Sequence, residues 1–164
     1  MQAASLRRLL NIWPPFLFGG IHVETVSHDW RYARVRLKLR WYNRNYVHTQ
    51  FGGNLFSMTD PFWMIMTLEA LGHDYIVWDK AGAIDFVAPG RADVIAEFHL
   101  DDAILDEIRA ATANGEKYLR WFEVQIKTDD GELIARVRKQ IYVRRKASHR
   151  HRRAETGMGA DPSG

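Results

Sequence analysis

One apolar segment contains two groups that could take part in a reaction. Gly52 and Gly53 stand near its start, and Asp60 follows toward its middle. If a helix begins at the glycines, its first backbone amides lack an intrahelical acceptor and carry the positive end of the helix dipole. Such amides can stabilise a developing negative charge. A carboxylate in apolar surroundings is costly unless it has a partner or a function, so Asp60 is a candidate catalytic group.

The segment that must position these groups runs from residue 51 to residue 72. Its apolar side chains fall on every face of a helix, and its only charged residues are Asp60 and Glu69. A helix that is hydrophobic all round is buried on more than one side. The segment is only marginally long enough to span a bilayer, and the acid near its middle argues against that. We therefore predict one long helix enclosed by the rest of the domain, and no membrane span.

Pro61 interrupts this pattern directly after Asp60. Proline lacks a backbone donor, so the helix must kink or restart there. Two interpretations of Asp60 stay open. It can cap the second half of a broken helix, because Asp-Pro is a favourable cap and first-turn pair. Alternatively, the kink aims its carboxylate at a cleft.

The rest of the chain predicts mainly antiparallel strands. Apolar and polar residues alternate with a period of two, as in a sheet with one buried face. The expected strands cover residues 21–27, 33–41, 83–87, 94–100, 122–127 and 133–143. Short helices are expected at residues 5–10 and 101–111, and Asp129-Asp130-Gly131 predicts a hairpin turn. The expected fold class is α+β, with an antiparallel sheet wide enough to curl around the long helix.

Composition excludes several kinds of chemistry. A chain of 164 residues is expected to form one domain, and the lack of cysteine excludes disulfides, thiolate metal sites and cysteine nucleophiles. The histidines show no metal-ligand spacing and no phosphate-binding glycine loop is present, so we expect no metal and no cofactor. The first residues do not resemble a secretory signal, and we expect a cytoplasmic protein.

Positive charge is concentrated at the end of the chain. The net charge is +3, and six of the 23 basic residues fall at or after Arg144. We expect an N-terminal helical cap at residues 1–20, the main domain at residues 21–145 and a basic, disordered tail at residues 146–164. Such a tail is most simply a solvated end, so no nucleic-acid partner is expected.

A signature around the central segment resembles that of the hot-dog fold. The matching residues are Asn45, Phe51-Gly52-Gly53, Phe56 and Met58-Thr59-Asp60, and residues 83–94 are similar to the strand–turn–strand of the same proteins. The resemblance is to acyl-CoA thioesterases related to those of the phenylacetate pathway, and especially to an uncharacterised thioesterase-like branch of unknown function. It implies an antiparallel sheet wrapped around one long central helix, and an acyl-CoA or other acyl thioester as the ligand.

The resemblance also implies roles for individual residues. The amide of Gly52 would bind the thioester carbonyl oxygen, and Asp60 would direct water or attack the carbonyl carbon. Asn45 would orient water or the acyl carbonyl, although a turn residue bonding its own backbone explains it equally well. The expected substrate-binding residues are His48, Gln50, Phe51, Gly53 and Phe56. Phe51 stands where the signature has a histidine.

The spacing of Gly52 and Asp60 predicts a shared site. Eight positions separate them, or about 12 Å along an ideal helix, so one carbonyl cannot touch both within one subunit. Two antiparallel helices from two subunits would bring Gly52 of one copy near Asp60 of the other. We therefore expect a homodimer with two sites at its interface, and dimers that can pair into tetramers.

A second function remains open from the sequence. A hot-dog dimer can hold an acyl-CoA or fatty acyl ligand without hydrolysing it, and Phe51 and Pro61 favour that interpretation. The fold by itself does not decide between these functions. The acyl group and the carrier, CoA or acyl-carrier protein, are also left open.

Overall fold

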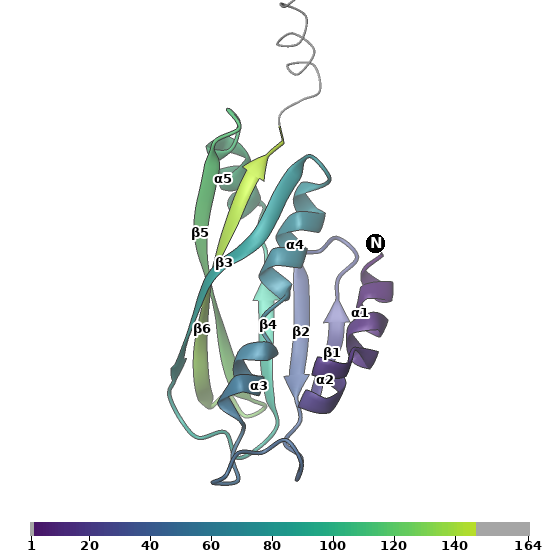
Figure 1. Cartoon of the computed structure of the whole chain (residues 1–164), viewed down its shortest axis with the longest axis vertical. Helices are drawn as coiled ribbons and strands as arrows, with labels where there is room; N and C mark the ends of the chain where they lie inside the picture. Colours follow the sequence, from purple (N-terminus) through teal and green to yellow (C-terminus); the bar gives the residue numbers. More distant parts are fainter. Residues whose placement is uncertain (1, 147–164) are drawn as a thin grey trace, which may run out of the picture.

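Six antiparallel strands form one sheet in the computed structural model, which describes residues 2–146 (Figure 1). The strand order is β1-β2-β4-β5-β6-β3. The strands are β1 (Ile21–Val26), β2 (Tyr32–Leu37), β3 (Tyr75–Phe86), β4 (Val94–His99), β5 (Lys117–Thr128) and β6 (Leu133–Arg145). The predicted α+β class with an antiparallel sheet is confirmed. The order puts β3 at one edge, beside β6 and away from its neighbours in the sequence.

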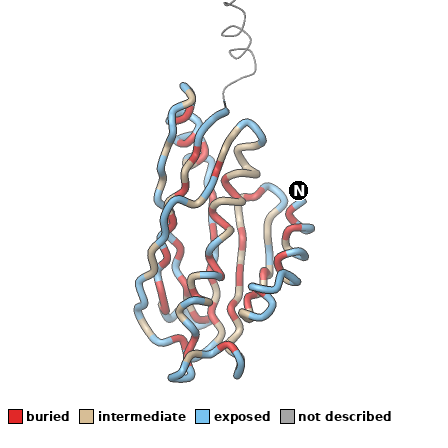
Figure 2. Tube along the Cα trace, viewed as in Figure 1, coloured by how far each residue is buried: buried red, intermediate tan, exposed pale blue. Residues whose placement is uncertain are grey.

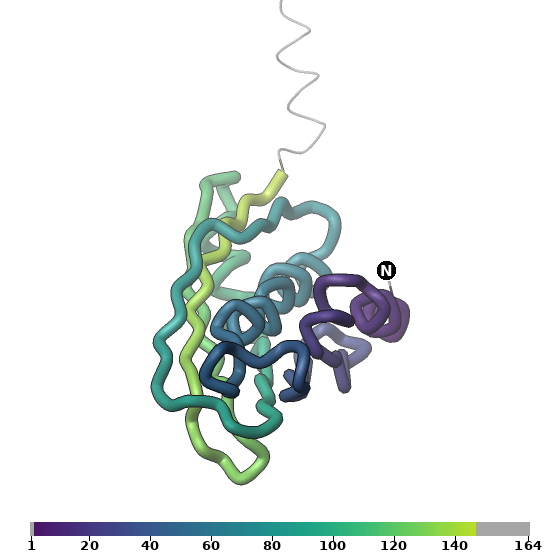
Figure 3. Tube along the Cα trace, turned by 60° about the horizontal axis from the view of Figure 1, so that its bottom comes forward, coloured from purple at the N-terminus to yellow at the C-terminus, as the bar shows by residue number. Residues whose placement is uncertain are grey.

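Five helices accompany the sheet in the described part of the chain. They are α1 (Ala3–Ile12), α2 (Pro14–Gly19), α3 (Gly52–Ser57), α4 (Phe62–Leu71) and α5 (Asp102–Ala111). Helix α1 packs beside β1, where Asn11 both donates to the carbonyl of Val23 and accepts from its amide. Helices α3 and α4 lie across one face of the sheet, as Figure 3 shows with the bottom of the molecule turned forward.

The prediction of one long central helix is wrong, whereas the predicted kink or restart at Pro61 is confirmed. The segment forms α3 and α4, and residues 58–61 separate them. Pro61 has no backbone donor, and the amides of Thr59 and Asp60 bond the carbonyls three positions before them, as in a tightened last turn. The position before α4 is Pro61 itself, and α4 has no side-chain cap. Asp60 therefore does not cap α4, and that interpretation is also wrong.

The core lies between α4 and the sheet. The buried ring of Trp63 stacks on Phe122 with centroids 4.6 Å apart and meets Phe98 edge-on at 5.3 Å. Such pairs add about 0.5–1.5 kcal/mol each beyond the burial of their surface. Figure 2 shows the buried residues concentrated along the strands and the sheet-facing side of the helices. The far side of α4 is only half-buried, at Met64, Ile65 and Leu68.

Two strand limits differ from the prediction for physical reasons. Strand β2 ends at Leu37, and the amide of Leu39 bonds the carboxylate of Asp93 at 2.9 Å rather than a neighbouring strand. Strand β3 starts at Tyr75, much earlier than the predicted residue 83. A register shift between Asp79 and Ala81 reverses which alternate residues face inward, so the strand shows no steady period of two in the sequence. The predicted tail lies outside the described residues except for Lys146, whose amide bonds the carbonyl of Asp74.

Candidate functional site

Asp60 is held by a buried lysine at the break between α3 and α4. The Nζ atom of Lys139 donates to Oδ1 of Asp60 at 2.5 Å. The Lys139 side chain is 4% exposed, whereas that of Asp60 is 54% exposed. In the described residues, the second oxygen of Asp60 has no partner. The ion pair thus fixes one end of a carboxylate whose other end reaches solvent.

A second carboxylate shares the same ammonium group. Oδ2 of Asp79 lies 3.4 Å from Nζ of Lys139, and its Oδ1 is buried without a hydrogen-bond partner in the described chain. Burial raises the pKa of the Asp79 carboxyl; the positive charge of Lys139 opposes this rise and the negative charge of Asp60 adds to it. One buried cation therefore balances two acids, of which Asp60 is half exposed and Asp79 is partly buried.

Lys139 and Asp79 were not among the predicted site residues. Inward positions of β6 alternate through Val137, Lys139 and Ile141, so Lys139 is a cation on the apolar face of a strand. That mismatch was a usable signal, because a buried charge is rare without a partner. No comparable indication marks Asp79 in the sequence, because the register shift beside it disturbs the alternation of inward and outward residues in β3.

Phe56 and Gly82 shape the space around Lys139. The Nζ atom lies 5.3 Å from the centre of the Phe56 ring, within range of a cation–π interaction. Gly82 pairs with Lys139 in the sheet, and a Cβ there would lie 2.7 Å from the tip of the Phe56 ring. Phe56, a predicted substrate-binding residue, thus packs over Gly82 and beside the Lys139 ammonium.

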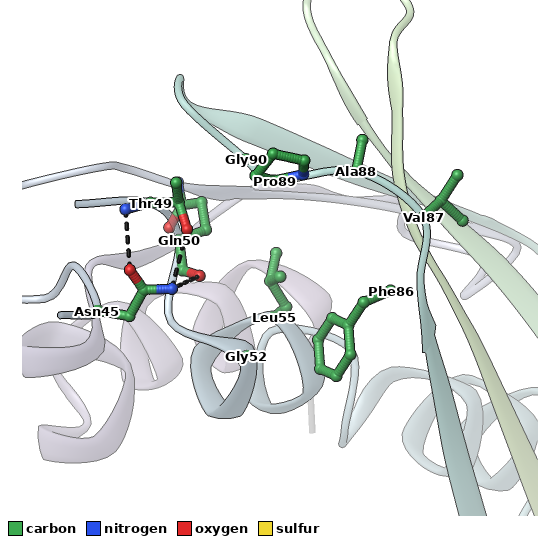
Figure 4. A pocket seen from close by; sticks show the side chains of 10 residues that line it. All are labelled: Asn45, Thr49, Gln50, Gly52, Leu55, Phe86, Val87, Ala88, Pro89 and Gly90. Atoms are coloured by element: carbon green, nitrogen blue, oxygen red, sulfur yellow. Dashed lines mark hydrogen bonds between the residues drawn. The ribbon is translucent and has the colours of Figure 1, made fainter. Parts of the chain in front are cut away.

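A separate pocket of about 440 Å³ lies at the start of α3 (Figure 4). Its lining residues are Asn45, Thr49, Gln50, Gly52, Leu55, Phe86, Val87, Ala88, Pro89 and Gly90. Three predicted site residues, Asn45, Gln50 and Gly52, come together here. Asp60 does not line this pocket. Gly52 and Asp60 therefore lie at different places within one chain, in line with the eight positions between them.

Gly52 makes room for an aromatic ring. A Cβ at position 52 would lie 2.8 Å from the tip of Phe86, which comes from the end of β3 and is 60% exposed. Gly53 does the same for the ring of Phe51, which would be 2.5 Å from a Cβ there. At each glycine an aromatic ring thus occupies the space that a Cβ would take, and the tip of the Phe86 ring lies against Gly52.

Asn45 uses its side chain to hold the loop before α3. Its Oδ1 accepts from the amides of Val47 at 3.1 Å and Thr49 at 3.0 Å. Its Nδ2 donates to the hydroxyl of Thr49 and to the carbonyl of Gln50. These contacts are those of a turn residue, which the sequence analysis had kept as an alternative.

Gln50 presents an unused acceptor in the pocket wall. Its Nε2 donates to the carbonyls of Leu37 at 3.3 Å and Ala92 at 3.0 Å, whereas its Oε1 is buried without a partner in the described residues. A buried orphan acceptor is costly and can accept a hydrogen bond from a ligand. His48, by contrast, is exposed, lies outside the pocket lining and adopts φ 64°.

Residues 2–146 contain neither a metal-binding cluster nor a membrane-spanning helix. No group of three or more His, Asp or Glu side chains is arranged to hold a metal ion. Within the same residues, no helix combines the length and apolar character needed to cross a bilayer.

Comparison with known proteins gives one family and many similar folds. A family model described as "Domain of unknown function (DUF4442)" matches residues 2–143. No curated protein shows a significant match in sequence. Among solved structures, a Pseudomonas aeruginosa protein of unknown function, described as a probable thioesterase, is 19% identical with a TM-score of 0.78, over 88% of this chain and 97% of that chain.

Two more structures agree in fold. A Haemophilus influenzae thioesterase has a TM-score of 0.64 at 13% identity, over 92% of this chain and 96% of its own. A Chlorobaculum tepidum protein of unknown function has a TM-score of 0.70 at 16% identity, over 88% and 94%. At these identities the matches establish a shared fold, and they confirm the resemblance to thioesterase-like proteins of unknown function.

Proposed function

Because the chain belongs to the family described as domain of unknown function DUF4442, whose chemistry its name leaves open, we propose a function from the site. The protein is a hot-dog dimer that binds and hydrolyses an acyl thioester, such as an acyl-CoA, at the interface between two copies. The observation that carries this proposal is the Asp60–Lys139 pair, which leaves one carboxylate oxygen of Asp60 facing solvent. A fixed, half-exposed carboxylate is suited to act as a general base.

Two features support a second copy of the chain. Strand β3 pairs only with β6 in the described structure, so its other edge presents a row of backbone donors and acceptors along twelve residues. Beside this edge, the apolar outer side of α4 is only half-buried. An isologous dimer would pair the edge with itself and cover that surface. Pairing of such dimers into tetramers remains part of the proposal.

The proposed reaction divides its tasks between the two copies. Water donates a proton to the unpaired oxygen of Asp60 while its own oxygen attacks the thioester carbonyl carbon. The carbonyl oxygen becomes an oxyanion, which the backbone amide of Gly52 in the other copy stabilises. The C–S bond then breaks, and the sulfur leaves as a thiolate that takes up a proton. The products are a carboxylic acid and a thiol, and no cofactor is required.

Thiol release from a panel of acyl-CoAs tests this proposal. Asp60→Asn keeps the shape of the side chain and removes the base, so we expect the rate to fall by about 100-fold or more. Asp106→Asn is the matched control, because Asp106 is an exposed acid of α5 that pairs with Arg109 at 2.8 Å and lies on neither β3 nor the pocket lining. Equal rates for the wild type and Asp60→Asn would remove Asp60 from the reaction.

Binding without hydrolysis is the second candidate function. The ring of Phe86 beside Gly52 and the phenylalanine at position 51 favour it, because both occupy space near the proposed oxyanion site. Calorimetric binding of a non-hydrolysable acyl-CoA analogue separates the two functions. Tight binding by a protein that releases no thiol from any acyl-CoA or acyl-carrier protein selects the binding function. We place either activity in the cytoplasm.

A further inference from the structure

An exposed group of large apolar side chains lies at one end of the molecule. We call it the aromatic patch; its members are Leu17, Phe18, Trp41, Tyr42, Tyr46 and Val47, all at least half exposed. Tyr46 is 99% exposed and Trp41 81%. Monomeric proteins rarely expose so many large apolar side chains together, and such patches mark interaction surfaces.

The two parts of the patch are joined by hydrogen bonds. Phe18 belongs to α2, and the other aromatic residues belong to the loop of residues 38–51. The side chain of buried Asn43 donates to the carbonyls of Gly19 and Lys38, each at 2.8 Å, which fixes the loop against the end of α2. The rings of Trp41 and Tyr42 meet edge-on at 5.6 Å. Figure 1 shows α2 and this loop at the same end of the molecule.

The loop that carries most of the patch is itself basic. Residues 38–51 contain Lys38, Arg40 and Arg44 and no acidic residue. Arg40 and Arg44, which flank the patch, are exposed and pair with no acid in the described residues. The patch therefore combines exposed Trp and Tyr rings with uncompensated positive charge.

We propose that the aromatic patch docks on the surface of an anionic lipid bilayer. Trp and Tyr rings favour the membrane–water interface, and nearby Arg side chains are attracted by anionic headgroups. A second copy of this chain is the less favourable occupant, because an isologous contact would bring Arg40 and Arg44 against like charges. The docking is independent of the thioester chemistry. The same loop supplies Asn45, Thr49 and Gln50 to the pocket, so docking brings the pocket close to the lipid.

Vesicle co-sedimentation of the full chain tests the proposal. One set of vesicles contains equal parts of phosphatidylcholine and phosphatidylglycerol, and the other contains phosphatidylcholine alone. The wild type is expected to pellet with the anionic vesicles, and less so at high salt. Trp41→Ser should lower the partition coefficient about tenfold because an apolar ring leaves the interface. Arg44→Ser should lower it about fivefold.

Trp121→Ser is the matched control. Trp121 is a half-exposed tryptophan of β5, away from the patch, and this variant keeps the basic end of the chain. It should pellet like the wild type. The proposal is overturned if the wild type does not pellet with the anionic vesicles. Equal pelleting of the wild type and all variants also overturns it, since binding would then come from elsewhere in the chain. It is also overturned if Trp41→Ser instead converts dimers to monomers in light scattering, which would identify a protein interface.

Discussion

Asp60 and Lys139 are 79 positions apart in the chain, and a hydrogen bond of 2.5 Å joins their side chains. The bond ties the break between α3 and α4 to the middle of the sheet. It also connects the solvent-facing carboxylate to an ammonium that is almost fully buried. Burial of the lysine depends on both of its acidic partners, because an isolated buried charge costs several kcal/mol.

Removing the lysine should destabilise the fold. Lys139→Met leaves the partly buried Asp79 beside Asp60 without a cation, and we expect the free energy of unfolding to fall by about 2 kcal/mol. This value is below that of a fully buried pair because Asp60 is half exposed. Urea denaturation at neutral pH measures the change. Arg138→Met, at an exposed position of the same strand, should change stability by much less.

The pH dependence of stability should report Asp79. Burial raises its pKa above the ordinary 3.8, so the folded state keeps a proton that the unfolded state has already lost. Folding then becomes less favourable as pH rises through that window. The Asp79→Asn variant has no carboxyl group to deprotonate at this position, so it does not lose stability in this way. Its stability relative to the wild type should therefore increase as pH rises above about 4. A difference that stays constant between acid and neutral pH would contradict this.

Gly52 and Phe86 should be energetically coupled. Gly52→Ala places a Cβ 2.8 Å from the Phe86 ring, and we expect it to cost about 1 kcal/mol of stability. In a Phe86→Ala background the same substitution should cost close to nothing, because the ring is gone. Thermal unfolding of the four proteins gives the coupling energy. Additive effects would mean that the ring moves aside freely.

Mixing two inactive variants tests whether each site is shared. Gly52→Pro removes the proposed amide donor at a helix position that accepts proline, and Asp60→Asn removes the proposed base. In a mixed dimer one site carries both defects and the other carries neither. Equal mixing should therefore restore about a quarter of the wild-type rate if the copies exchange.

The outcome separates the shared site from a site within one chain. If a single chain held both groups, no mixture of the two variants could contain an intact site, and the rate would stay at the level of the variants. Circular dichroism of each variant before mixing confirms that both are folded. Restored activity also requires the dimer itself, which light scattering measures directly.

Local sequence was sufficient for much of the fold. Alternation in β4 and β6, the turn at Asp129-Asp130-Gly131 and the helix before Asn114 all depend on neighbours a few residues apart. The break after Asp60 followed from Pro61, whose missing donor acts within one helical turn. The resemblance around Gly52 identified the segment where a pocket forms. Each of these features depends on chemistry that is local along the chain.

Only the tertiary structure brought Lys139, Asp60 and Asp79 together. Their contact depends on the place of β3 beside β6 and on the register shift between Asp79 and Ala81, which reverses the alternation in that strand. The ring of Phe86 reaches Gly52 for the same reason. Strand order and register are set by packing over the whole core, because many local patterns are compatible with several pairings.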